Sequence, residues 1–219
     1  MADLKDATLD EIRAALIGDV AGNAAFDGWT ARAVAAAAAA RGVDPDVAKL
    51  AWPGGAIEMI DAWFADIDRR MLAKLPPEVL ATMKVRQRIA GLVEARLALL
   101  AGSREALRRA LAVLAMPQNL PRAARLGWRS ADVMWRAAGD TATDYNHYTK
   151  RAMLGGVHAA TVQVFLGDDS DGHAETSAFL QRRIDGIMAF EKTKAGVLMR
   201  AQRRPSLSRF VGRLRYPVR

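Results

Sequence analysis

The sequence contains no cysteine and only three histidines among its 219 residues. Without cysteine the chain forms no disulfide bond and offers no thiolate ligand to a metal ion, which suits a reducing compartment. No Glu-x-x-His pair occurs, and this excludes a four-helix di-iron site of the usual form. His147 and His158 would lie roughly 16 Å apart along a helix, too far to share one ion. We therefore expect neither a bound metal nor a cofactor.

Long apolar runs are also missing. No run reaches the roughly 18 residues that a membrane-spanning helix needs. The first residues, MADLKDATLDEIR, lack the basic segment and apolar core of a signal peptide, so we expect none. Hydrophobic residues still make up 51% of the chain, which is enough to bury a core.

Acidic residues are absent from the last twenty positions. Residues 200–219 hold seven arginines and no acid, whereas the whole chain carries a net charge of +8. The rest of the chain is therefore nearly neutral, and the basic character belongs to a tail. Such a basic tail can bind nucleic acid, anionic lipid or an acidic protein.

Helical patterns fill the chain, and no useful period-2 alternation appears. Thr8 with Glu11 forms a capping box, and Asp44-Pro45 supplies an N-cap followed by a first-turn proline. Caps and breakers predict helices over about 8–20, 30–41, 44–52, 55–75, 77–102, 103–116, 121–138, 143–167, 174–202 and 206–215. We expect an all-α protein of TetR-like outline, divided into a degenerate helix-turn-helix region (1–53), a helical domain (54–202) and a basic tail (203–219).

The second helix of the predicted helix-turn-helix unit would present its first residues to DNA bases. That helix, DPDVAKLAW at 44–52, begins with Asp44 and Asp46, and Lys49 is its only base. Carboxylates are repelled by phosphates, while DNA-reading helices use Arg, Lys, Asn and Gln. We expect no nucleic-acid binding, although a ligand-responsive TetR-type repressor is the alternative function for this fold.

A polar and aromatic segment, GDTATDYNHYTKRAML, covers Gly139 to Leu154. With a cap at Thr143, helical periodicity places Asp144, His147, Tyr148 and Arg151 on one face, together with His158 further along. The residues include no nucleophile–base pair and no metal cluster, so we expect no enzymatic activity. Two interpretations stay open, a buried polar network and a surface for a partner protein.

The tail segment LSRFVGRL has apolar residues at i, i+3, i+4 and i+7 with arginines beside them. This pattern is typical of a helix that lies in a membrane interface, although the same stripe could dock on the protein's own core. The residues expected to contact a membrane are Leu207, Arg209, Phe210, Val211, Arg213, Leu214 and Arg215.

A pocket for a polyprenyl chain would need apolar walls between the helices. Each candidate wall residue also fits an ordinary core position. The candidates are Leu97, Leu100, Leu111, Leu114, Leu126, Trp128, Val157, Val164 and Phe179.

Several motifs together resemble one family, the TetR-fold accessory proteins of ubiquinone (coenzyme Q) biosynthesis. The C-terminal half carries the more diagnostic ones, and the resemblance covers most of the chain. The motifs are FDGWT (26–30), WPGGAIEMI (52–60), MPQN (116–119) with LPRAARL after it, Met134-Trp135, AGD (138–140), TDYNHYTKRAML (143–154), LGDDS (166–170) and FLQRRI (179–184).

The resemblance implies a non-enzymatic protein that binds isoprenoid lipid. It would present a quinone precursor to the membrane-associated di-iron hydroxylase that acts on demethoxyubiquinone. The family's hydroxylase-contacting residues fall on Met134, Asp144, His147 and Tyr148, with Arg151 nearby. His147 departs from the tryptophan common in the family, and its smaller ring predicts a weaker contact.

The resemblance also implies a location and an oligomeric state. We expect a homodimer formed through the late helices, as TetR-like proteins usually pair. We expect a peripheral protein at the cytoplasmic face of a bacterial inner membrane, or at the matrix side of the mitochondrial membrane in a eukaryote.

Overall fold

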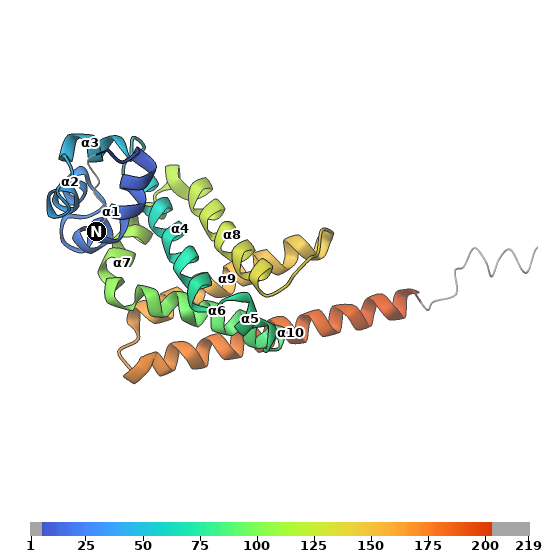
Figure 1. Cartoon of the computed structure of the whole chain (residues 1–219). Helices are drawn as coiled ribbons and strands as arrows, with labels where there is room; N and C mark the ends of the chain where they lie inside the picture. The colour runs from blue at the N-terminus through green and yellow to red at the C-terminus, as the bar shows by residue number, and fades with distance from the viewer. Residues whose placement is uncertain (1–5, 203–219) are drawn as a thin grey trace, which may run out of the picture.

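The protein is described by a computed structural model covering residues 6–202. Every regular element in that range is helical, which confirms the predicted all-α class. Figure 1 shows the arrangement. The α-helices are α1 (Leu9–Asp27), α2 (Ala31–Ala40), α3 (Pro45–Leu50), α4 (Ala56–Lys74), α5 (Pro77–Ala81), α6 (Val85–Leu100), α7 (Arg104–Leu114), α8 (Leu120–Ala137), α9 (Tyr145–Gly167) and α10 (Ala174–Gln202).

Local capping fixes the starts of the first helices as predicted. The Thr8 hydroxyl accepts a hydrogen bond from the Glu11 backbone N–H at 3.3 Å, and the Glu11 carboxylate accepts one from the Thr8 N–H at 2.8 Å. The Asp44 carboxylate accepts from the Asp46 N–H at 2.7 Å, with Pro45 in the first turn. These bonds satisfy donors that a helix leaves free at its N-terminus.

The prediction of one helix over 77–102 is wrong, because the chain breaks between α5 and α6. Arg88 fixes the break by donating hydrogen bonds to the carbonyls of Met83 at 2.9 Å and Ala81 at 3.3 Å. The Gln87 side chain accepts from the Lys84 N–H at 3.0 Å and so caps the new start. These side chains supply partners that a continuous helix would have provided.

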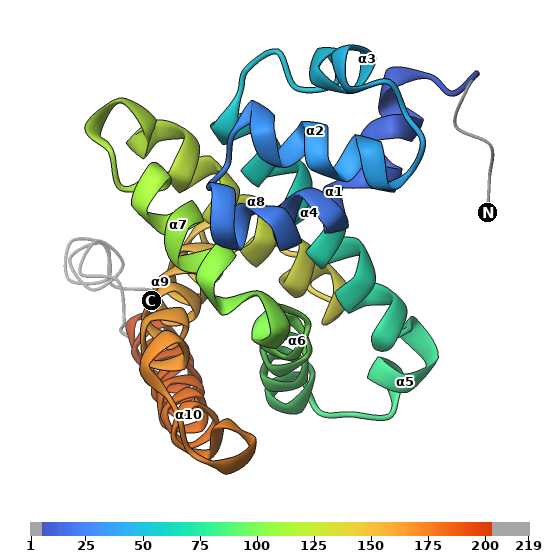
Figure 2. The ribbon, with the colours of Figure 1, turned by 90° about the vertical axis from the view of Figure 1, so that its left-hand side faces the viewer.

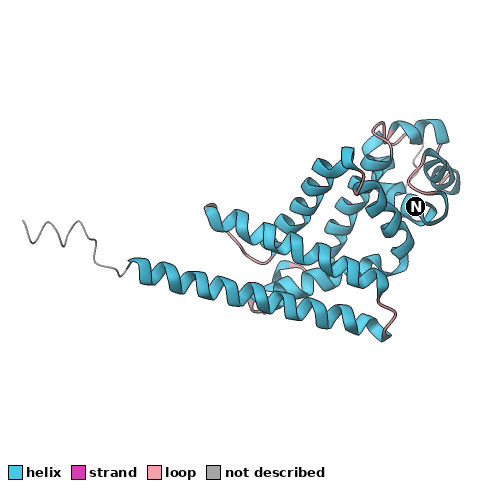
Figure 3. Cartoon of the chain, turned by 180° about the vertical axis from the view of Figure 1, so that it is seen from behind, coloured by secondary structure: helices cyan, strands magenta, loops and turns pink. Residues whose placement is uncertain are grey.

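Helix α4 lies at the centre and packs against α1, α6, α7 and α8, while α9 packs between α8 and α10 (Figure 2). Seen from behind, α10 runs along the body and continues beyond the other helices (Figure 3). Among residues 6–202, no helix combines the length and apolar character required to cross a bilayer.

The three N-terminal helices share one hydrophobic core with the rest of the body. Trp29 is buried, its indole N–H donates to the Ala106 carbonyl at 3.1 Å, and its ring lies 5.1 Å from that of Trp63. Buried aromatic contacts of this kind hold the N-terminal unit against α4 and α7. Residues on both sides of position 53 thus belong to the same core. The predicted domain boundary at residue 53 stays a prediction.

The LGDDS motif builds the turn between α9 and α10. The Asp168 carboxylate accepts hydrogen bonds from the Ser170 and Thr176 hydroxyls and from both backbone N–H groups. Bonds from these side chains stabilise the ionised form and hold the pKa of Asp168 well below its usual value. Arg104 donates to the Leu166 and Asp168 carbonyls and ties the turn to α7.

Candidate lipid-binding site and partner surface

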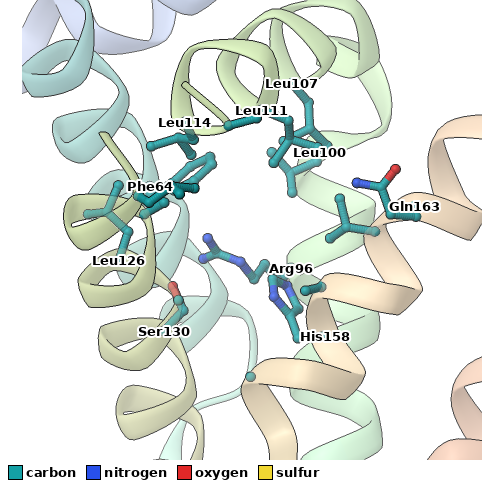
Figure 4. Close-up of a pocket in the computed structure, with 17 residues that line it drawn as sticks. Phe64, Arg96, Leu100, Leu107, Leu111, Leu114, Leu126, Ser130, His158 and Gln163 are labelled. Atoms are coloured by element: carbon teal, nitrogen blue, oxygen red, sulfur yellow. The ribbon is translucent and has the colours of Figure 1, made fainter. Parts of the chain in front are cut away.

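A pocket of about 340 Å³ lies among α4, α6, α7, α8 and α9 (Figure 4). Its walls are mainly apolar, in part because α7 places leucines at i, i+4 and i+7, on the one face that lines the pocket. Of the nine predicted wall residues, four line it: Leu100, Leu111, Leu114 and Leu126.

A glycine on α8 leaves one edge of the pocket uncovered. Gly127 lines the pocket, and a Cβ atom added there would meet no other atom within 4 Å. On α9, Gly155 also lines the pocket, and its added Cβ would lie 4.0 Å from the Gly127 carbonyl oxygen. The two glycines thus let α8 and α9 approach while leaving space between the helices.

One end of the pocket is polar. We call this the polar end and define it by Arg96, Ser130 and His158, which line the pocket, together with Asp68, which contacts Arg96 and Ser130. Arg96 is only 2% exposed and forms an ion pair with Asp68, which also accepts from the Ser130 hydroxyl at 3.1 Å. The Arg96 guanidinium lies 5.4 Å from the centre of the Phe64 ring. The pair is neutral as a unit, which limits the cost of burying its charges.

Burial shifts the titration of each ionisable group at the polar end. Burial raises the pKa of Asp68 and lowers that of Arg96, while the attraction between them opposes both shifts. Burial, with the Arg96 charge as a second cause, lowers the pKa of His158 to about 3. His158 is therefore neutral near pH 7, with one ring nitrogen able to donate and the other to accept.

Two buried nitrogens at the polar end have no hydrogen-bond partner, Arg96 Nε and His158 Nε2. The sequence analysis did not place Arg96, Ser130 or His158 in the walls of a pocket. A signal was present, because Arg96 stands on the apolar face of VRQRIAGLVEARLALL, four residues after Leu92 and four before Leu100. A buried charged side chain on a core face requires partners, and it often marks a functional site.

The five other predicted wall residues do not line this pocket. Leu97 is buried in the core, and Trp128 on α8 is 36% exposed with its ring turned towards α9. The guanidinium of Arg183 lies 4.9 Å from the Phe179 ring. Val157 packs against the core, and Val164 is partly buried. Contact of these residues with a lipid stays a prediction.

Three rings form an aromatic cluster on α8 and α9. The centre of the Trp128 ring lies 6.3 Å from that of His147 and 6.0 Å from that of Tyr148, and the last two are 5.1 Å apart. Tyr148 is 60% exposed. Aromatic side chains that are exposed beside one another suit a protein partner.

Beneath this cluster lies a charged network. Arg151 is buried, and it donates to the Asp132 carboxylate at 2.6 Å and to that of Asp140 at 3.0 Å. Lys150 pairs with Asp140 at 2.7 Å. Burial alone would raise the pKa of Asp140, but hydrogen bonds from Lys150 and Arg151 outweigh it and lower the pKa. The segment Gly139–Leu154 thus contains a polar network below an exposed aromatic surface.

The turn before α9 shows why the AGD motif is present. Gly139 has φ +91°, a conformation that L side chains rarely adopt, and Arg88 donates to the Ala138 carbonyl at 2.9 Å. Asp144, rather than the expected Thr143, caps α9 by accepting from the Asn146 N–H at 3.0 Å.

Two of the predicted partner-binding residues are not accessible in this conformation. Met134 is 0% exposed, because its side chain packs into the core from α8, and Arg151 is held by the two carboxylates. Direct contact of either with a partner does not fit this arrangement. Arg151 also donates to the His147 backbone carbonyl at 3.0 Å, which links it to the aromatic cluster.

The N-terminal unit keeps the charge pattern seen in the sequence. Lys49 pairs with Asp46 at 2.8 Å, so its charge is already compensated within α3. This observation favours a helix that does not read DNA. Across residues 6–202, no three His, Asp or Glu side chains are grouped so that they could hold a metal ion.

Fold and pocket together define a class: a TetR-like helical protein with an interior apolar hollow. The TetR transcriptional regulator from Nitrosomonas europaea superposes with a TM-score of 0.64, covering 80% of this chain and 97% of that one. The sequence identity is 23%, so this likeness shows the fold alone.

The chain belongs to the COQ9 family of ubiquinone biosynthesis proteins, which confirms the resemblance seen in the sequence. Residues 120–191 match the family model COQ9. The mitochondrial ubiquinone biosynthesis protein COQ9 of Rattus norvegicus is 34% identical over 168 residues, which are 74% of this chain and 54% of that protein. The Homo sapiens protein is 33% identical over 74% of this chain and 52% of its own length, and that of Drosophila melanogaster 28% over 84% and 57%. The chain thus spans about half the length of these relatives.

Proposed function

We propose that the chain is a non-enzymatic, lipid-binding accessory protein of ubiquinone biosynthesis. It binds an isoprenoid quinone precursor and presents it to the membrane-associated di-iron hydroxylase that acts on demethoxyubiquinone. The observation that carries the proposal is the apolar pocket of about 340 Å³ among α4 and α6–α9. The names of the relatives, which are ubiquinone biosynthesis proteins, support it.

Such a protein lowers the free energy needed to move a very apolar molecule out of the bilayer. Each CH₂ group exposed to water costs about 0.8 kcal/mol. A cavity of about 150 Å³ accommodates benzene, so the larger pocket suits a substituted ring with its first isoprene units. The remaining tail would stay outside the pocket, in contact with the bilayer. No bond is made or broken by the protein itself.

The direct test is hydroxylation of a demethoxyubiquinone embedded in vesicles by the purified hydroxylase, with and without the chain. We expect the chain to raise the initial rate while adding no activity in the absence of the hydroxylase. An unchanged rate at saturating chain would contradict the proposed function.

Tyr148→Ala tests the proposed partner surface. Tyr148 is largely exposed and central in the aromatic cluster, so its loss should weaken hydroxylase binding by about tenfold, ~1.4 kcal/mol, with little change in melting temperature. Calorimetric titration with the hydroxylase measures the affinity. Phe26→Ala is the matched control, since Phe26 is an exposed aromatic on α1. Equal affinities for the two variants would count against this surface.

The proposed membrane contact involves the tail. Leu207, Phe210, Val211 and Leu214, with Arg209, Arg213 and Arg215, lie outside the described residues. We expect the intact chain to float with vesicles that contain anionic lipid, because each arginine near such a surface contributes about 1 kcal/mol. Deleting residues 206–219 should remove most of this binding. Flotation that does not change upon deletion would reject a membrane role for the tail.

Location and assembly follow from the same proposal. We place the protein at the cytoplasmic face of a bacterial inner membrane, or at the matrix side if the source is eukaryotic, as the mitochondrial names of the relatives suggest. We also propose a homodimer formed through the late helices.

A further inference from the structure

One side of the opening of the pocket is formed by the turn between α7 and α8 and by the first half of α8. The lining residues Ala115, Leu120 and Gly127 are exposed there, whereas the neighbouring lining residues Leu114 and Leu126 are buried. In Figure 2 this turn lies at the outer edge of the body. A ligand that enters or leaves the pocket therefore passes this part of the surface.

Two large apolar side chains are exposed at this turn. Met116 is 45% exposed and Leu120 is 54% exposed. Exposed apolar side chains that lie close together mark a contact with another protein or with a membrane. Because Leu120 also lines the pocket, whatever covers the two side chains also faces the opening.

The charge beside the turn favours an anionic partner. Between Glu105 and Asp132 the chain has five arginines and no acid. Two of these arginines, Arg122 and Arg125, are exposed, and neither forms an ion pair or a hydrogen bond within residues 6–202. We call Met116, Leu120, Arg122 and Arg125 together the turn surface.

Two carboxylates share a surface depression with the two arginines, but both are already paired. Glu58 and Asp61 line this depression, and Leu126 lines both it and the apolar pocket. Glu58 pairs with Arg13 at 3.1 Å. Asp61 pairs with Arg129. The depression beside the opening thus holds two positive charges that no carboxylate compensates.

We propose that the turn surface is a second membrane contact, by which the folded body docks on an anionic phospholipid bilayer. Met116 and Leu120 enter the boundary between head groups and acyl chains, and the two arginines bond to lipid phosphates. A bilayer supplies apolar and anionic groups side by side, as this surface requires. The contact brings the opening of the pocket to the bilayer, so an apolar ligand is exchanged without crossing water. The inference goes beyond the proposed contact of the tail, and it rests on the proposed function for its use.

The absence of cysteine allows a single label to report this contact in the full-length chain. Met116→Cys carries the environment-sensitive fluorophore NBD, and the probe is a vesicle of phosphatidylcholine and phosphatidylglycerol with a nitroxide in the acyl chains. Met116 does not line the pocket, so quenching reports the bilayer and not the hollow. Val79→Cys is the matched control, since Val79 is 41% exposed on α5, beyond the opposite end of α4.

We expect vesicles to quench the label at position 116 and to leave the label at position 79 unquenched. Quenching at position 116 that is no greater than at position 79, or a chain that does not bind these vesicles, overturns the inference. Stimulation of the hydroxylase by the wild type is measured separately, so either result leaves the proposed function standing.

A double variant tests the charges. Arg122→Gln combined with Arg125→Gln should lower the affinity for the same vesicles, without nitroxide, by at least about tenfold in a sedimentation assay. The control is Arg32→Gln combined with Arg70→Gln, which changes the net charge equally at arginines that already form ion pairs. It should lower the affinity less than about threefold. A double variant that binds like its control, or that keeps vesicle binding and instead loses affinity for the purified hydroxylase, overturns the membrane contact.

Discussion

Replacing Gly127 with leucine is expected to weaken lipid binding by at least about tenfold while the protein remains as stable as the wild type or becomes more stable. Gly127 lines the pocket and is itself exposed, and an added Cβ there meets no other atom within 4 Å, so a leucine side chain has room to cover the opening of the hollow. Exchanging an interior helical glycine for a good helix former contributes about 1 kcal/mol. Lost space should lower the affinity for a prenylated ligand by at least about tenfold, ~1.4 kcal/mol.

The measurement combines calorimetric titration with thermal unfolding. Gly156→Leu is the matched control, because Gly156 also lies within a helix, has open space at its Cβ position and does not line the pocket. It should gain helix stability and keep its ligand affinity. If both variants bind like the wild type, the ligand occupies another part of the molecule.

Arg96→Met should lower the melting temperature more than any of the other substitutions proposed for this protein. The change leaves the Asp68 carboxylate buried without its cation, and breaking one partner of a buried pair costs about 3–5 kcal/mol. For a chain of this size that corresponds to a fall of about 6–20 °C. Differential scanning calorimetry of the intact protein measures it.

A double variant tests whether the stability lost in Arg96→Met is due to the unpaired charge of Asp68 or to the changed side-chain shape. Arg96→Met combined with Asp68→Asn removes both charges and keeps a hydrogen-bond acceptor for Ser130, so most of the lost stability should return. Arg86→Met is the surface control: Arg86 pairs with Asp185 in the open, and its loss should change the melting temperature little. A double variant no more stable than Arg96→Met would show that the pair's charges do not determine the loss.

Local chemistry made much of the fold predictable. The starts of α1 and α3 depend on contacts within one helical turn, those of Thr8 with Glu11 and of Asp44 with Asp46. Such contacts can be predicted from the sequence, and the structure confirms both helix starts. The break between α5 and α6 was not predictable in this way. It depends on Arg88 reaching back to Ala81 and Met83 and across to Ala138, and the last contact joins segments far apart in sequence.

In the candidate site, too, the features set by local sequence were predictable and those set by packing between helices were not. Leu111 and Leu114 were among the predicted wall residues and both line the pocket, since helical periodicity places them on one face of α7. The position of Trp128 depends instead on how α8 rotates against α9, which turns its ring towards His147 and Tyr148. The polar end escaped prediction, since no local pattern shows that Arg96 meets Asp68 from another helix and His158 from a third.

The central claim is that the hollow among α4 and α6–α9 holds an isoprenoid lipid. The most direct measurement is mass spectrometry of lipid extracted from the intact chain after purification from membranes that make ubiquinone. The account predicts a prenylated phenol or quinone that co-purifies with the wild type and with Gly156→Leu but is lost in Gly127→Leu. Wild-type protein that carries no such lipid, or Gly127→Leu that carries as much as the wild type, would contradict it.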